Sequence, residues 1–138
     1  MSKAILGTKL GMSQVFAANG DLIPVTVVEV KPNVVVAVKS VESDGYNAVQ
    51  LGYGEVKDKH LTKPVKGQFE KAGVAPVKYL REYRLAEKPE YTVGQTLAAD
   101  IFAEGEVIDV IGTSNYLKII INGNIPLEAW ESELRILC

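Results

Sequence analysis

The residues best suited to bind another molecule form a positively charged stretch in the middle of the chain. Residues 57–88, here called the basic island, hold nine Lys and Arg against four Asp and Glu, a local charge of +5 in a chain of net charge −2. A local excess of cations neutralises phosphates and releases their counterions, so it predicts a limited nucleic-acid footprint. Charge alone leaves a solvated Lys-rich loop open as the alternative.

Eight cations and two aromatic rings of the basic island are the candidate contacts. Aromatic faces among cations suit stacking on the bases of single-stranded RNA. Phe69 also lies in the island, but its helical spacing favours a place in the core. The candidate RNA-binding residues are Lys57, Lys59, Lys63, Lys66, Lys71, Lys78, Arg81, Arg84, Tyr79 and Tyr83.

The residue types that serve catalysis or metal binding are scarce. His60 is the single histidine, and it has no Cys or second His nearby with which to share a metal. A Ser-His-Asp or Cys-His arrangement would have to use His60, and no Ser or Cys has the sequence context of a nucleophile. The glycines of residues 7–11 and 52–54 do not match a phosphate-binding loop. We therefore expect no catalytic residue, no metal and no cofactor.

Turn signals divide the chain into short strands rich in Val and Ile, which indicates a mostly β protein. Short strands of this kind, joined by tight turns, favour a closed barrel. The expected turns are Asn19-Gly20, Asp44-Gly45, Glu104-Gly105 and Asn122-Gly123. The expected strands are residues 22–30, 34–41, 47–53, 79–85 and 107–111.

One segment, residues 64–72, breaks the β pattern and predicts a short helix. Thr62 and Pro64 mark its start and Gly73 its end. Both faces of residues 25–30 are largely apolar, as in a strand that is covered on two sides. The helix is therefore expected to cover part of the outside of the barrel.

Length and composition fit one domain over residues 1–138. No apolar run approaches the ~18 to 20 residues of a membrane helix, and the N-terminus lacks a signal-peptide pattern. The lone cysteine, Cys138, forms no internal disulfide. We expect a cytoplasmic protein that makes no membrane contact and is a monomer when isolated.

Five stretches of residues 1–114 closely resemble the bacterial form of the large-subunit ribosomal protein 3 family. The matching stretches are ILGTKLGMSQVF (5–16), NGDLIPVTVVEV (19–30), DGYNAVQLGYG (44–54), KPVKGQFEKAGVAPVKYLREYRL (63–85) and VGQTLAADIFAEGEVIDVIGTS (93–114). The resemblance implies a closed six-stranded Greek-key barrel of the translation-protein (reductase/isomerase/elongation factor) type. It also implies a structural, non-enzymatic role, with large-subunit ribosomal RNA and neighbouring ribosomal proteins as partners.

Residues 115–138 do not resemble the family. There the family has a long Gly- and Lys-rich arm that enters ribosomal RNA, whereas this chain has one Lys, one Arg and three Glu. The pattern predicts replacement C-terminal strands that close the barrel, with residues 116–121 and 134–137 as a hairpin around Asn122-Gly123. Leu117, Ile119, Trp130 and Leu134 are expected to be buried.

Three origins of this segment stay open: a deliberately shortened barrel, a natural gene rearrangement and a frameshifted end.

The resemblance and the basic island together favour one function for the chain. This function is that of an rRNA-binding structural constituent of the large ribosomal subunit that lacks the basic arm. The alternative is an engineered or rearranged arm-deleted scaffold with little or no RNA binding. A flavin or nucleotide enzyme on a similar barrel is a third, for which a phosphate motif is missing.

Overall fold

The computed structural model describes residues 3–103, 105, 106, 108, 110–113, 116–120, 127–130 and 133–137, with side chains up to residue 110 and backbone alone after it. These residues form two β-sheets and a few short helices, so the prediction of a mostly β chain is confirmed. The chain divides into two compact units, each described here by itself. Unit 1 is Met1–Lys31 with Ala98–Cys138, and unit 2 is Pro32–Leu97. The single domain over residues 1–138 stays a prediction.

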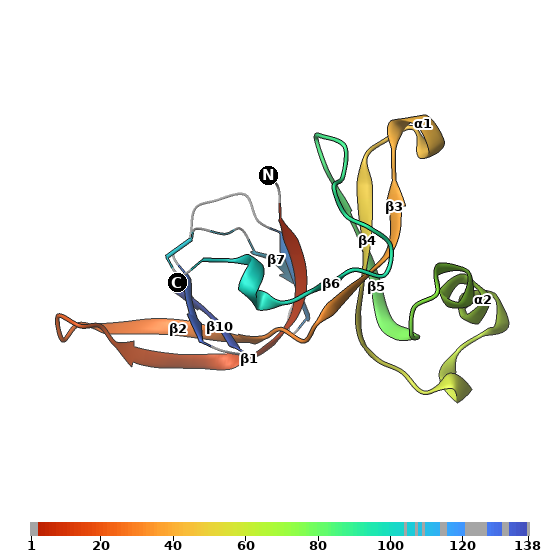
Figure 1. The fold of residues 1–138 in the computed structure, drawn as a ribbon. Coiled ribbons are helices and arrows are strands. Elements are labelled where there is room, and N and C mark those ends of the chain that lie inside the picture. Colours follow the sequence, from red (N-terminus) through yellow and green to blue (C-terminus); the bar gives the residue numbers. More distant parts are fainter. Residues whose placement is uncertain are drawn as a thin grey trace. The chain divides into compact units, whose positions relative to one another are not determined.

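Unit 1 is built around a long antiparallel hairpin of β1 (Ala4–Phe16) and β2 (Leu22–Glu29) (Figure 1). Its turn falls at Asn19-Gly20, as predicted: Gly20 has a φ of 89°, and the Asn19 Oδ1 accepts a hydrogen bond of 3.1 Å from the Asp21 backbone N–H. Asn side chains stabilise tight turns in this way. The six strands of the sheet run in the order β7-β8-β1-β2-β10-β9. The other four are β7 (Val110–Thr113), β8 (Tyr116–Ile120), β9 (Leu127–Trp130) and β10 (Glu133–Leu137).

A small apolar core lies against the inner half of this hairpin. Ile5 and Val28 are fully buried with Ile108, and Phe102 joins them just after the 3-10 turn η2 (Ala99–Ile101). The Lys3 ammonium lies 3.3 Å from the Glu106 carboxylate and fastens the same loop to the start of β1. The core therefore joins the first strands of the chain to residues about one hundred positions later.

The strands of residues 115–138 flank the hairpin on both sides. β8 pairs with β1 between Ala4 and Thr8, so the predicted pairing of this segment with a family-like strand is confirmed for Tyr116–Ile120. The predicted hairpin between this strand and residues 134–137 is wrong, because β1 and β2 lie between β8 and β10 in the sheet. The predicted turn and the predicted burial lie outside what the structure describes; they concern Asn122, Gly123, Leu117, Ile119, Trp130 and Leu134.

Unit 2 holds a separate four-stranded sheet in the order β5-β4-β3-β6. α1 joins the first and second of its strands in the chain at the position of the predicted Asp44-Gly45 turn, and Gly45 ends this helix with a φ of 83°. The long connection from β4 to β5 contains the helix that the sequence predicted. The elements are β3 (Asn33–Lys39), α1 (Val41–Asp44), β4 (Ala48–Glu55), η1 (Asp58–His60), α2 (Lys63–Ala72), β5 (Val77–Arg84) and β6 (Thr96–Leu97).

The prediction of a closed six-stranded Greek-key barrel is wrong. Three of the strands assigned to it, β3, β4 and β5, pair with one another in unit 2. In the sheet of unit 1, the end strands β7 and β9 do not pair with each other within the described residues. The alternation of apolar and polar residues along a strand shows which face of the strand is buried, but it does not show which other strand lies beside it. The same set of strands is therefore compatible with one barrel or with two sheets. α2 correspondingly packs on β3 of unit 2 and does not cover a barrel.

No helix among the described residues has the length and apolar character needed to cross a membrane.

Two glycines of unit 2 provide a test of this packing. A Cβ added at Gly52 in β4 would lie 2.6 Å from the Val77 Cγ2, whereas one added at Gly67 in α2 would meet nothing within 4 Å. We expect Gly52→Ala to lower the free energy of unfolding by ~1 to 3 kcal/mol through overpacking. Gly67→Ala, the control, should raise it by ~0.5 to 1 kcal/mol because Ala favours the helix. Urea denaturation followed by circular dichroism measures both, and equal effects would contradict the packing.

Removal of residues 115–138 tests the role of β8 and β10. The truncation leaves the edges of β1 and β2 that face away from each other without partners, and unpaired edges favour aggregation. We expect a chain that ends at Ser114 to unfold or aggregate, as measured by circular dichroism and size-exclusion chromatography. A stable, monomeric truncation would show that these strands are dispensable.

Candidate nucleic-acid interface

Helix α2 presents three of the candidate lysines. Thr62 precedes it, Pro64 lies in its first turn, where its missing N–H costs no hydrogen bond, and Gly73 ends it with a φ of 68°. Phe69, 1% exposed, anchors the helix in the interior of unit 2, as its spacing predicted. The candidate lysines of the helix, Lys63, Lys66 and Lys71, are all exposed.

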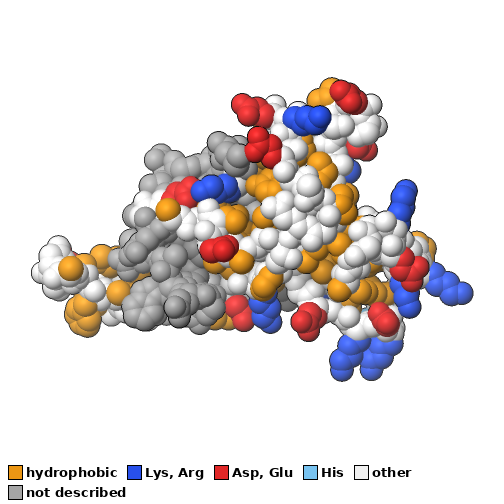
Figure 2. Space-filling view, in the orientation of Figure 1, with side chains coloured by type: hydrophobic (Ala, Val, Ile, Leu, Met, Phe, Trp, Pro, Cys, Tyr) orange, Lys and Arg blue, Asp and Glu red, His pale blue; other side chains and the backbone are white. Residues whose placement is uncertain are grey.

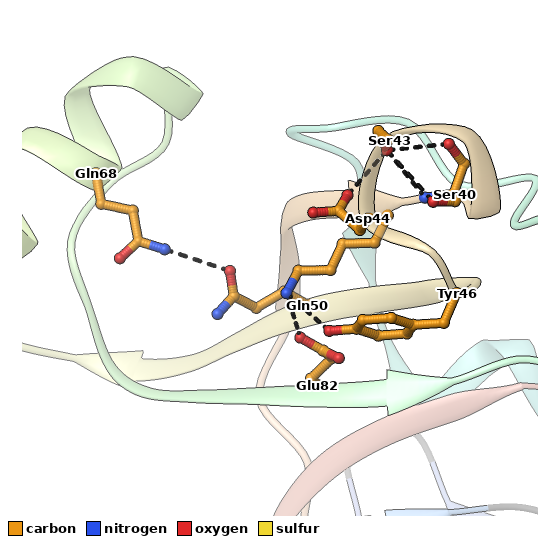
Figure 3. Close-up of polar contacts among 8 residues, drawn as sticks. Ser40, Ser43, Asp44, Tyr46, Gln50, Gln68 and Glu82 are labelled. Carbon is orange, nitrogen blue, oxygen red and sulfur yellow. Dashed lines mark hydrogen bonds and ion pairs between the residues drawn. The ribbon is translucent and has the colours of Figure 1, made fainter.

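A polar contact holds the same helix to the sheet. The Gln68 amide of α2 donates a hydrogen bond of 3.4 Å to the Gln50 side chain of β4 (Figure 3). Because Gln50 pairs with Glu82 in register, this contact lies on the face of the sheet that also carries Glu82 of β5. The helix that carries these lysines is therefore held to unit 2 by the buried Phe69 and by the hydrogen bond from Gln68 to Gln50.

Lys57 and Lys59 lie in the connection before α2. Both are exposed around the 3-10 turn η1, and His60 beside them is exposed as well. Figure 2 shows Lys and Arg side chains projecting from the right of the molecule, where Figure 1 places α2 and this connection. Within the described part of the chain, no three His, Cys, Asp or Glu side chains are grouped as a metal site.

The cations of β5 do not share one face. β5 is an edge strand of unit 2 that pairs with β4, and Lys78, Arg81 and Arg84 are exposed along it. Arg81 is opposite Leu51 and Arg84 opposite Ala48. Residues three apart on a strand point to opposite faces, so Arg81 and Arg84 do not reach the same surface. The Arg81 guanidinium also donates a hydrogen bond of 2.7 Å to the Leu80 carbonyl.

The two candidate tyrosines differ in exposure. Tyr79 is half-buried, and the Lys78 ammonium lies 5.3 Å from the centroid of its ring. Tyr83 is 8% exposed and lies near Tyr91, whose pKa is raised by burial and then by Tyr83. A ring as buried as that of Tyr83 does not offer its face to a base, so stacking is a possibility for Tyr79 alone of the two.

The candidate cations make no close ion pair among the described residues, although Arg84 interacts with the Glu82 charge at longer range. Among the described residues, the ion pairs join Lys3 to Glu106, Lys31 to Glu29 and Lys39 to Glu82. None of them uses a candidate lysine or arginine. Exposed cations without acidic partners can neutralise the phosphates of a nucleic acid at little cost.

A polar cluster that sequence reasoning missed lies beside Arg84. The Lys39 ammonium is 2.8 Å from the Glu82 carboxylate and donates a hydrogen bond of 3.0 Å to the Tyr46 hydroxyl. Figure 3 shows Tyr46, from the loop before β4, and Glu82, from β5, pointing toward one another. The Arg84 guanidinium lies 4.7 Å from the centroid of the Tyr46 ring. Glu82 and Arg84 are two residues apart and therefore share a face of β5, but no local signal in the sequence pointed to Lys39 or Tyr46.

Comparison with known proteins shows what the chain is similar to, although no family model matches it. It is 54% identical to large ribosomal subunit protein uL3 of Geobacillus sp. (strain WCH70) over 114 residues, which are 83% of this chain and 54% of that protein. It is 55% identical to uL3 of Cutibacterium acnes over 112 residues, 81% of this chain and 50% of that protein. It is 52% identical to uL3 of Acaryochloris marina over 114 residues, with shares of 83% and 54%.

Identity of this extent shows that the matched residues correspond to a segment of uL3 proteins. The chain carries a partial uL3 segment, which confirms the resemblance inferred from residues 1–114. It spans about half the length of the curated relatives that it matches.

The Lys39–Glu82 pair predicts a loss of stability in acid. Hydrogen bonds from Lys39 and then Tyr46 hold the pKa of Glu82 below its ordinary value of 4.5. A depressed carboxyl pKa stabilises the folded state above the ordinary value, and this stabilisation is lost as the pH falls through the folded-state pKa. We expect Glu82→Gln to be less stable than the unmodified chain at about pH 7 and to approach it at about pH 3.

Urea denaturation at the two pH values measures this difference. Glu55→Gln is the control, since Glu55 is an exposed carboxylate of β4 that makes no ion pair within the described residues. A stability difference for Glu82→Gln that does not change with pH would contradict the role of the charge.

Proposed function

We propose that this chain is a structural component of the large ribosomal subunit in the cytoplasm, and that unit 2 binds large-subunit ribosomal RNA through the basic island. The observation that carries the proposal is the set of exposed cations that make no ion pair in the described residues. The relatives support it, because their name places them in the large ribosomal subunit. Neighbouring ribosomal proteins are the second class of partner, and the isolated chain is a monomer.

The contacts that we propose are the eight exposed cations and the ring of Tyr79. Lys57 and Lys59 contact phosphates from the connection before α2, and three lysines contact them from the helix itself. Lys78, Arg81 and Arg84 add contacts along β5, on both of its faces. This footprint is small, and no catalytic step is part of the role.

We further propose that the chain binds RNA without the long basic arm of its family. Residues 115–138 carry one Lys and one Arg against three Glu, so this segment does not neutralise phosphates as a Lys-rich arm does. Fewer phosphate contacts make binding weaker and less dependent on salt. Each contact contributes ~0.7 to 0.9 to the slope of log affinity against log salt.

Matched charge reversals test the footprint. Lys63→Glu with Lys66→Glu changes the net charge by the same amount as Lys9→Glu with Lys31→Glu, whose residues lie in unit 1. We expect the first pair to abolish binding or to reduce the salt slope by roughly 1.4 to 1.8, because two phosphate contacts are lost. The second pair should leave the slope nearly unchanged. Gel-shift titrations with bacterial large-subunit RNA at several salt concentrations provide the measurement.

Three results of this experiment go against the proposal. Equal losses from both pairs would indicate diffuse attraction in place of a defined footprint. No binding by the unmodified chain would favour the alternative of an arm-deleted scaffold. A salt slope equal to that of a full-length uL3 protein measured in parallel would contradict the missing arm.

A further inference from the structure

We propose that Tyr46 is a positioning residue that holds the Arg84 guanidinium flat against its ring, so that Arg84 binds one RNA phosphate through two parallel hydrogen bonds. Tyr46 is not a member of the candidate set drawn from the sequence. Its role deepens the proposed RNA-binding function and rests on it. The cluster consists of Lys39, Tyr46, Glu82 and Arg84.

The register of the sheet brings these residues together. Lys39 of β3 and Arg84 of β5 are both opposite Ala48 of β4, so they lie in one row on the two sides of the middle strand. Ala48 is fully buried, and its side chain ends at Cβ. The ring of Tyr46 lies close to both cations, with its hydroxyl at Lys39. The ring centroid is 5.3 Å from the Lys39 ammonium and 4.7 Å from the Arg84 guanidinium carbon.

The single carboxylate of the cluster is shared unequally between its two cations. Glu82 lies 2.8 Å from the Lys39 ammonium, which places the negative charge on Lys39. Arg84 contacts the Tyr46 ring and interacts with the Glu82 charge only at longer range, since the ion pairs of the described residues do not include Arg84. The guanidinium therefore keeps its donors for an external ligand.

Hydrogen bonds fix the backbone on both sides of the stack. The Val41 N–H donates a hydrogen bond of 3.3 Å to the Asn47 side chain, and the Ser40 N–H donates one of 3.4 Å to the Ser43 hydroxyl. Leu85, next to Arg84, donates its N–H to the Asn47 carbonyl at 2.9 Å. Tyr46 lies between Gly45, which ends α1, and Asn47, so the residues on both sides of the stack are tied to the same loop.

The chemistry of Arg84 selects the ligand. A guanidinium stacked on an aromatic ring keeps its planar fork, and this fork matches two oxygens of a phosphate. A ring beneath the fork reduces the rotamer freedom that is lost on binding. A lysine at the same place would supply the charge without the paired geometry. The ligand is therefore one phosphate group of the RNA backbone.

Charge-conserving variants test the inference by gel-shift titration with bacterial large-subunit RNA. Arg84→Lys should weaken binding about tenfold with an unchanged salt slope, because it removes the paired geometry and keeps the charge. Lys9→Arg, the matched control at a lysine of unit 1 outside the proposed footprint, should change affinity by no more than about twofold. Tyr46→Phe keeps the ring and should bind within about threefold of the unmodified chain. Tyr46→Leu removes the ring and should match Arg84→Lys.

The double variant Tyr46→Leu with Arg84→Lys separates positioning from general stability. If Tyr46 acts through Arg84, the double variant binds no more weakly than Arg84→Lys alone. Urea denaturation confirms that each variant is folded, and Arg84→Lys carries the test if Tyr46→Leu does not fold. Unchanged affinity of Arg84→Lys, or losses that add in the double variant, would overturn this inference alone. A chain that does not bind RNA at all overturns the proposed function together with it.

Discussion

The pairing of β1 with β2 is the interaction on which unit 1 depends. Buried backbone N–H and C=O groups need partners, and the inner half of this hairpin carries the fully buried Ile5 and Val28. β1 obtains its second partner from β8 and β2 obtains its second partner from β10. Both strands belong to the segment that does not resemble uL3. A segment of new sequence therefore completes a sheet whose centre is family-like, because strand pairing uses backbone groups that every residue except proline supplies.

Unit 2 depends on the separation of its apolar side chains, which are buried, from its charged side chains, which are exposed. Phe69 and the buried strands hold the helix and the sheet together, so the lysines of α2 are not needed for internal pairing. The one strong ion pair of this unit, between Lys39 and Glu82, uses a lysine outside the basic island. The positive charge of the island is therefore left at the surface. The proposed RNA contacts follow from that imbalance, since a cation with an internal partner would have to give it up before binding a phosphate.

Local patterns predicted the local elements well and the partners of the strands poorly. The Asn19-Gly20 turn and the helix that begins near Pro64 were predicted because their signals lie within a few residues of each other. The barrel was wrong because the partner of a strand such as β3 is set by residues far away in the chain. The same limit hid the cluster at Tyr46: Lys39 meets Glu82 across three strands, and only the register brings them together. The exposure of the candidate lysines, in contrast, can be predicted from their charge alone.

The division into two units separates the segment that does not resemble uL3 from the proposed binding surface. Residues 115–138 complete the sheet of unit 1, whereas every candidate cation lies in unit 2. The strands and helix that present those cations pair and pack within unit 2 itself. The pairing of β8, β9 and β10 therefore does not determine the local geometry of the basic island. The proposed absence of the arm and the proposed RNA footprint thus depend on different parts of the chain, so the two can be tested independently.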